Sequence, residues 1–254
     1  MSDEKLIIYQ VFTRLFGNNN NHCINNGSIT ENGCGKMADF TAKALGEILK
    51  QLDEEGVLTL NKELELPLLT QRIAVISSAT AAGYGDFCNQ LEHNPYGFVF
   101  YPRLFPAVMQ GDRVEETIIA ALDTINARRD DWDVVVIIRG GGATSDLSGF
   151  DTYDLAANCA QFPLPVITGI GHERDDTVLD SVSHTRVKTP TAAAEFLINH
   201  LRSTAETLED YASSILYAVT TRMEREKTRL TRLVERIPMQ TLLFVPERKE
   251  KQPL

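Results

Sequence analysis

Five consecutive aliphatic residues, Val134 to Ile138, constrain the fold of this chain more than any other stretch. A strand that presents apolar side chains on both of its faces is typical of a parallel sheet that is covered on both faces. It runs directly into Arg139 and three glycines at positions 140–142. Such strands end at the edge of the sheet where α/β proteins bind their ligands. The stretch predicts a ligand site there, although a flexible turn with a surface arginine is an alternative interpretation.

The flanking sequence alternates between short apolar runs and amphipathic segments. The periodicity predicts strands at residues 72–78, 96–105, 133–139 and 163–171, and helices at residues 84–93, 112–129 and 151–161. In the second helix, one face collects Val114, Ile118, Ala121, Leu122 and Ile125. Strands and helices in strict succession imply right-handed crossovers. The expected fold is therefore an α/β open parallel sheet with flanking helices.

From residue 191 the pattern changes to one long helix. Residues 191–237 contain no proline or glycine, with Thr189-Pro190 as the entry signal and Pro238 as the expected stop. Apolar residues recur about every seven positions: Leu201, Leu208, Ile215, Leu216, Val219, Met223, Leu230, Leu233 and Ile237. This spacing predicts coiled-coil packing against another helix, and the alternative is a helix that lies back on its own domain.

The sequence divides into five segments. Residues 1–48 read as a strand, an Asn-rich loop and a helix, which would make one βα unit and not a domain. Residues 49–70 are expected to continue as helix and then as an extended connector. Residues 71–190 form the α/β core, residues 191–237 the helical arm and residues 238–254 a tail.

Composition limits the function classes. The net charge of −10 and the pI near 5.0 count against a protein that coats nucleic acid non-specifically, but not against a local basic surface. Four cysteines without a CxxC spacing predict reduced thiols in a cytoplasmic protein. The sequence has no apolar run of membrane-spanning length and its N-terminus does not resemble a signal peptide. It also lacks complete GxGxxG, P-loop, GxSxG and HExxH motifs.

Four segments lie at the carboxyl ends of the predicted strands, which places them at one edge of the sheet: residues 77–87, 102–105, 139–147 and 169–177. The first, third and fourth of them carry chemically active side chains. They contribute Asp86, Arg139, His172, Glu173, Arg174, Asp175 and Asp176. Arginine stabilises charge on phosphoryl oxygens, histidine transfers protons near neutral pH, and a carboxylate orients histidine, positions water or holds a divalent ion. Taken singly, Asp86 reads equally well as a helix cap, His172 as a loop residue, and the two aspartates at 175 and 176 as first-turn acids. Their convergence on one edge favours a site for phosphate esters.

Five stretches together resemble the large subunit of exonuclease VII. They are RIAVISSATAAGYGDF, YPRLFPAVMQGD, VVVIIRGGGATSDLSGFD, PVITGIGHERDDTVLD and RVKTPTAAAE, in the family's order. The resemblance covers residues 49 to about 237. It implies hydrolysis of single-stranded DNA to short oligonucleotides, in complex with a small helical subunit that would bind the C-terminal helix.

The resemblance also implies roles for individual residues. Active-site positions fall on Asp86, Arg139, His172 and Asp175, and phosphate contacts are expected from Ser77, Ser78, Gly140, Gly141, Gly142, Arg186 and Thr189. His172 would act as general acid or base, while the two aspartates orient it or place the attacking water. No cofactor is strictly required in the family, although Asp86, Asp146, Asp175 and Asp176 are an alternative set of ligands for Mg²⁺.

The N-terminal segment departs from the family pattern. The family begins with an OB-fold, and residues 1–48 do not supply its five strands. The stretch IIYQVFTRLFG instead resembles the start of an α-amylase-type glycosidase, as a fused or repurposed segment would. Two alternatives to a nuclease follow: a non-catalytic scaffold without its DNA-binding module, and a glycosidase fragment.

Overall fold

The computed structural model describes residues 37–140, 147–171 and 177–244, with side chains given from residue 44 to residue 236 in those ranges. The chain divides into two compact units, one up to Leu201 and one from Arg202 onward. The first unit holds the sheet, and the second holds most of one long helix.

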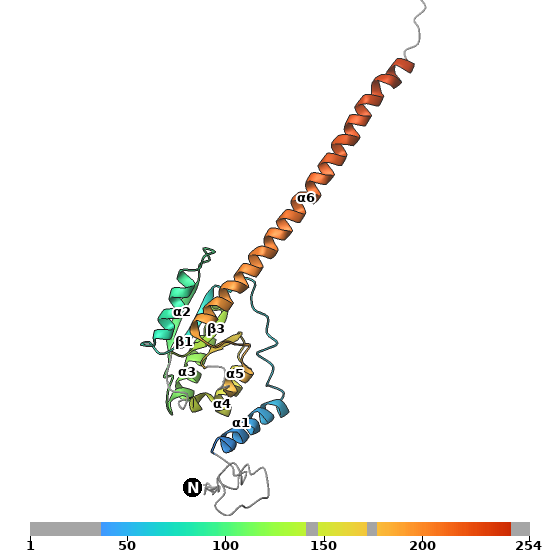
Figure 1. The fold of residues 1–254 in the computed structure, drawn as a ribbon. Coiled ribbons are helices and arrows are strands. Elements are labelled where there is room, and N and C mark those ends of the chain that lie inside the picture. Colours follow the sequence, from blue (N-terminus) through green and yellow to red (C-terminus); the bar gives the residue numbers. More distant parts are fainter. Residues whose placement is uncertain (1–36, 141–146, 172–176, 245–254) are drawn as a thin grey trace, which may run out of the picture. The chain divides into compact units, whose positions relative to one another are not determined.

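Five parallel strands form one sheet in the order β2-β1-β3-β4-β5 (Figure 1). Their bounds are Arg72–Ser77 (β1), Tyr101–Pro106 (β2), Val134–Ile138 (β3), Val166–Gly169 (β4) and Thr185–Arg186 (β5). Strand β3 is central, with Val136 opposite Val75 of β1 and Ile167 of β4. All five residues of β3 are fully buried, as the aliphatic run predicts. The predicted α/β parallel sheet is confirmed.

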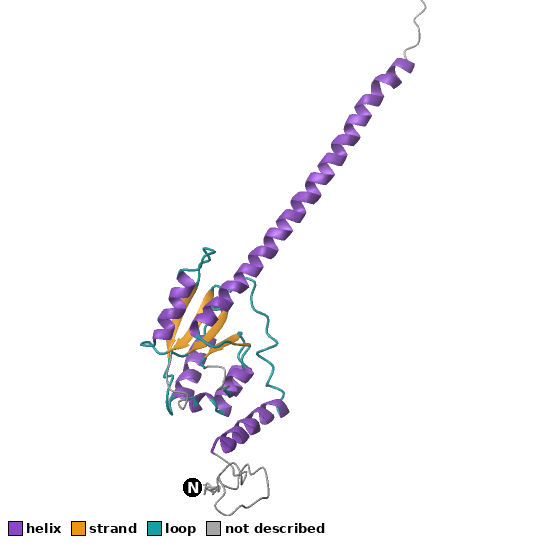
Figure 2. Ribbon diagram, in the orientation of Figure 1, coloured by secondary structure: helices purple, strands orange, loops and turns teal. Residues whose placement is uncertain are grey.

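Helices cover both faces of the sheet (Figure 2). They are α1 (Met37–Glu54), α2 (Ala82–Glu92), α3 (Val114–Asn126), α4 (Tyr153–Ala160), α5 (Val178–Val182) and α6 (Pro190–Phe244). Alternate residues of β3 point to opposite faces of the sheet and contribute to two hydrophobic cores. Val135 and Ile137 pack with α1, α3, α4 and α5. Val134, Val136 and Ile138 pack with α2 and the first turns of α6. The five predicted apolar residues of α3 are all buried.

Strand β2 begins later than predicted. Residues 96–100 are not in a strand, because Asn94 organises a turn before it. Its Nδ2 donates to the carbonyls of Leu91 and Phe98, and its Oδ1 accepts from the amides of Tyr96 and Phe98. Residues 102–105, which the prediction places at the carboxyl end of the strand, lie inside β2 and form most of it. The two-residue strand β5 has too short a pattern to predict.

The segment between α1 and β1 is held against the sheet by one buried side chain. Asn61 is completely buried, and its Nδ2 donates to the carbonyl oxygens of Phe162 and Leu164. Its Oδ1 accepts from the amides of Val166 and His184. The segment therefore packs as part of the first unit, and α1 ends at Glu54, before a turn in which Gly56 has φ 71°.

Helix α6 continues past the predicted stop. It begins at Pro190, where the Thr189 hydroxyl accepts from the Ala192 amide as a helix N-cap, and it runs to Phe244. The prediction that Pro238 ends it is wrong, because a proline removes one hydrogen bond and disfavours the helix without forbidding it. Within residues 37–140, 147–171 and 177–244, no helix has the length and apolarity needed to cross a membrane.

Candidate functional site

A cleft lies at the carboxyl ends of β1, β2 and β3. It has a volume of about 590 Å³. After β1 it is lined by Ser78, Thr80, Ala81 and Ala82, after β2 by Ala107, Val108, Met109 and Gln110, and after β3 by Arg139 and Gly140. This is the edge at which parallel α/β sheets bind ligands. Arg139 and Gly140 thus lie at an open cleft.

Backbone segments approach each other closely behind this cleft. A Cβ atom added to Gly83 would lie 2.9 Å from Cγ of Pro190 and 3.0 Å from Cα of Gly140. A Cβ atom on Gly140 would lie 3.4 Å from the amide nitrogen of Gly83. The start of α2, the end of β3 and the start of α6 therefore meet where two residues lack side chains. Gly83 was not predicted as a site residue, although it lies in the glycine-containing stretch AAGYG.

The first turn of α2 presents backbone amides beside Gly140. The first four amides of an α-helix have no partner within the helix, and they favour anions. No acidic residue occupies the first turn of α2, and its N-cap residue, Ala81, makes no side-chain cap. The amide donors at this end of α2 are thus not satisfied by a capping side chain.

Arg139 is held at the floor of the cleft. Only 6% of the residue is exposed, and its amide donates to the carbonyl of Gly169 at 3.2 Å. A largely buried guanidinium carries a charge that is difficult to screen, which suits it to bind a phosphate.

The two serines after β1 have different surroundings. Ser77 is completely buried, and its hydroxyl donates to the carbonyl of Ile138 at 2.8 Å. Its hydroxyl thus links β1 to β3, and Ser77 is not among the residues that line the cleft. Ser78 does line it, with its hydroxyl 3.3 Å from that of Thr80. The structure therefore brings Ser78 to the cleft together with Thr80, which sequence reasoning did not single out.

Asp86 is exposed in the second turn of α2. The N-cap position of this helix belongs to Ala81, so the alternative interpretation of Asp86 as a helix cap is wrong. Asp86 follows Ala82 by four residues and lies on the same face of the helix, and Ala82 lines the cleft.

The two remaining predicted contacts lie near the start of α6. Arg186 is exposed in the edge strand β5, opposite Thr168 of β4. Thr189 caps α6, and its carbonyl oxygen lies 3.2 Å from the position of a Cβ added to Gly169. Thr189 therefore packs against the end of β4, close to where Arg139 leaves β3.

Several predicted residues lie outside the described part of the chain: Gly141, Gly142, Asp146, His172, Glu173, Arg174, Asp175 and Asp176. The strands that lead into these segments are described, and Ile138 of β3 pairs with Gly169 of β4. The two segments consequently leave the sheet from neighbouring strands at the same edge. Among the residues that the structure does describe, no group of three His, Cys, Asp or Glu side chains is placed to hold a metal ion.

A buried carboxylate anchors both ends of the segment that contains His172. Asp180 accepts from the hydroxyl of Thr168 at 2.6 Å and from that of Thr177 at 2.8 Å. The amide of Asp180 donates back to Thr177, which completes a capping box at the start of α5. Thr168 precedes the segment and Thr177 follows it. Sequence reasoning missed this anchor, although the spacing Thr-x-x-Asp is the signal of a capping box.

Asp151 adds a second tie at the same place. Its carboxylate accepts from the amide of Val178, and burial raises the pKa of Asp151, an effect that this hydrogen bond partly opposes. Two acidic side chains thus fix the start of α5.

Comparison with known proteins identifies the family. Residues 57–252 match the family model described as "Exonuclease VII, large subunit". The chain is 39% identical over 163 residues to the exodeoxyribonuclease 7 large subunit of Lactobacillus johnsonii, which covers 62% of this chain and 35% of that protein. It is 31% identical over 201 residues to the exodeoxyribonuclease 7 large subunit of Anaplasma marginale, and this match covers 79% of this chain and 49% of that protein. The chain spans less than half of these relatives, and it belongs to the exonuclease VII large-subunit family.

Proposed function

We propose that this chain hydrolyses phosphodiester bonds of single-stranded DNA and releases short oligonucleotides, as the catalytic subunit of an exonuclease VII. The observation that supports this most is the cleft in which buried Arg139, Gly140 and the first turn of α2 come together. Each of the three groups is suited to an anion, and a scissile phosphate is the anion that this family would place there.

The phosphate would be held by Arg139 and by the backbone amides of Gly140, Gly141 and Gly142. Glycines allow the backbone to approach an oxygen without a Cβ in the way. Arg139 would stabilise the charge that develops on the phosphoryl oxygens in the transition state. Ser78, Arg186 and Thr189 would contact neighbouring parts of the strand.

His172 would transfer the proton. In hydrolysis a water molecule attacks phosphorus, the bond to the leaving oxygen breaks, and that oxygen takes up a proton. His172 would either accept the proton of the water or supply the proton of the leaving oxygen. Asp175 and Asp86 would orient His172 or position the water. Mg²⁺ held by Asp86, Asp146, Asp175 and Asp176 is the alternative way to activate the water.

A small helical subunit would bind the second unit. From Leu208 to Val234 the apolar stripe of α6 is exposed: Leu208, Ile215, Leu216, Val219, Met223, Leu230, Leu233 and Val234. Such a stripe is typical of a helix that packs against another helix. The cysteines Cys88 and Cys159 are free thiols, which fits action in the reducing cytoplasm.

One observation favours a second candidate, a scaffold without catalytic activity. The apolar residues exposed along α6 would allow the chain to assemble with another helix without any chemistry at the cleft. A labelled single-stranded oligonucleotide separates the candidates: the nuclease shortens it, with or without added small subunit, and the scaffold leaves it intact in both cases.

The assay is repeated with an excess of chelator and with the variant Arg139→Lys. Unchanged cleavage in chelator supports proton transfer by His172, and loss of cleavage supports the Mg²⁺ alternative. Arg139→Lys keeps the charge but loses the planar donor pair, so we expect a loss of roughly 10²-fold in kcat/KM. Near-wild-type cleavage by this variant would contradict the role of Arg139.

A further inference from the structure

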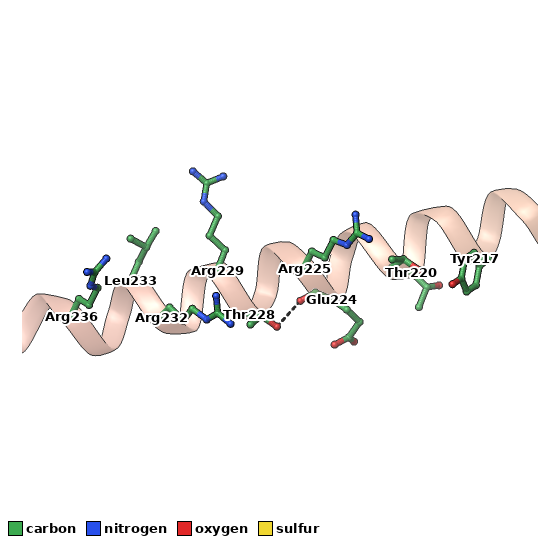
Figure 3. Close-up of a pocket in the computed structure, with 10 residues that line it drawn as sticks. Tyr217, Thr220, Glu224, Arg225, Thr228, Arg229, Arg232, Leu233 and Arg236 are labelled. Atoms are coloured by element: carbon green, nitrogen blue, oxygen red, sulfur yellow. Dashed lines mark hydrogen bonds between the residues drawn. The ribbon is translucent and has the colours of Figure 1, made fainter.

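A row of arginines follows one face of α6 in the second unit. Arg225, Arg229, Arg232 and Arg236 are spaced by four, three and four residues, which places them on one side of the helix over about 16 Å. All four are exposed. In Figure 3, Arg225, Arg229 and Arg236 extend to one side of the ribbon and Glu224 extends to the other.

The same residues border a groove along the helix. The groove has a volume of about 840 Å³. Its lining includes these four arginines, one acidic residue, Glu224, the apolar Leu233, and Tyr217. Tyr217 is 75% exposed. Cationic grooves with an exposed aromatic ring suit single-stranded nucleic acid, because phosphates meet the cations and a base stacks on the ring.

Charge is distributed unevenly along this helix. Residues 217–236 contain six Lys and Arg against three Glu, whereas residues 202–216 contain one Arg against three Asp and Glu. The whole chain carries a net charge of −10, so this stretch is a local exception. The ion pair between Arg229 and Glu226, at 3.6 Å, joins two exposed side chains (74% and 58% exposed) and contributes little stability.

The arginine row and the apolar stripe occupy different faces. With 3.6 residues per turn, the stripe that includes Met223 and Leu230 is centred roughly 120° around the helix from the row. Leu233 of the stripe borders the groove, so a partner helix centred on the stripe would lie next to Arg229 and leave Arg225 and Arg232 accessible. From the row, the groove and the charge distribution, we infer that this face of α6 binds the phosphate backbone of single-stranded DNA, as a contact surface additional to the cleft. The choice of DNA as the ligand rests on the proposed function.

The test uses the full chain with His172→Ala, so that the strand is not degraded during the measurement. Binding of a labelled oligothymidylate is followed by fluorescence anisotropy as the salt concentration rises. Changing the four row residues (225, 229, 232 and 236) from Arg to Gln should weaken binding at low salt at least about tenfold. It should also make the slope of log K against log salt less negative by about 2–3, since each phosphate contact on a single strand contributes about −0.7.

Two matched variants separate the row from net charge. A control with Lys50, Arg113, Arg128 and Arg129 changed to Gln removes the same charge from exposed positions of the first unit and should change the slope by less than half as much. A second variant with the four row residues changed to Lys keeps the charge and should retain the slope. Circular dichroism shows whether each variant keeps its helix.

Each outcome decides the inference. Equal effects of the row variant and the charge control would overturn it, as would an unchanged slope. A row variant that binds DNA normally but no longer binds an acidic helical protein would assign the row to that partner instead. Absence of cleavage by the wild-type chain, together with arginine-dependent binding, would count against the proposed function and leave this inference standing.

Discussion

The parallel sheet and the distal part of α6 carry similar aliphatic residues, but only the sheet buries them. Val134 to Ile138 are completely buried, whereas the stripe from Leu208 to Val234 is 49–68% exposed. Within α6 itself the first turns bury Ala193, Ala194 and Leu197 against the sheet. Apolar side chains stabilise a fold only where water is excluded from them, so the buried residues of the sheet stabilise the first unit, whereas the exposed stripe adds no such stability to the second unit.

The largest expected difference between the sheet and the stripe of α6 comes from placing an aspartate in each of them. Val136→Asp puts an unpaired carboxylate at a completely buried position of β3 and should cost more than about 4 kcal/mol of folding free energy. Leu216→Asp places the same charge at a position that is 68% exposed and should change it by less than about 0.5 kcal/mol. Urea denaturation of both variants measures this. Similar losses would show that the stripe is already buried within the chain.

Disruption of the stripe should act on assembly and not on folding. Leu208→Asp combined with Leu230→Asp removes two aliphatic contacts worth about 1.5–3 kcal/mol each from a helical partner. Association with the small subunit should weaken by 10²-fold or more, as measured by calorimetry, with an unchanged melting temperature of the free chain.

Ser213→Asp combined with Thr231→Asp is the control for this pair. Ser213 and Thr231 are 18 residues apart in the sequence, which is about five helical turns. Both therefore lie on one face of α6, and that face is not the one that carries the stripe. The control should keep its affinity. If both double variants lose the partner equally, charge on α6 and not the stripe determines the association.

Two glycines of α2 allow a similar comparison between a packed and an open position, with a smaller expected effect on stability. Gly83→Ala would place a Cβ atom 3.0 Å from the backbone of Gly140, and we expect a destabilisation of about 1–3 kcal/mol. Gly85 has no atom within 4 Å of its Cβ position, so Gly85→Ala should stabilise α2 by about 0.5–1 kcal/mol. Thermal melts of both variants measure the difference. A tolerated Gly83→Ala would show that the close approach behind the cleft is not required.

The smallest effect concerns pH. Burial lowers the pKa of His184, whose Nε2 donates to the carbonyl of Leu64. Because the unfolded chain then binds a proton more readily than the folded chain, His184 costs stability as pH falls below about 6.5. His184→Gln should reduce the dependence of unfolding free energy on pH between neutral and mildly acidic conditions. An unchanged dependence would assign it to other groups.

Residues with strong periodic patterns were predictable from the sequence. The buried strand from Val134 to Ile138 and the apolar face of α3 are confirmed. They were predictable because a strand buried on both faces, or a helix buried on one face, requires a recognisable pattern of apolar residues in the sequence. The cleft residues Arg139 and Gly140 were predicted for the related reason that parallel strands end at one edge.

Features that depend on contacts between distant segments were not predictable. Asn61 bonds to residues more than 100 positions away, and nothing local distinguishes it from a surface asparagine. The need for glycine at position 83 arises from Gly140 and Pro190, which are near it only in the folded chain. The start of β2 was misplaced because Asn94 satisfies backbone groups of an apolar stretch that reads as a strand.

The most direct test of the central claim, that this edge of the sheet hydrolyses single-stranded DNA, compares His172→Ala and Asp175→Asn with the exposed controls His93→Ala and Asp123→Asn. Rates of oligonucleotide release are measured for all four, with the melting temperature as a check on folding. Removal of a proton-transfer group should slow cleavage about 10²–10⁴-fold without a change in melting temperature, and the controls should cleave normally. Wild-type rates for both site variants would contradict the account.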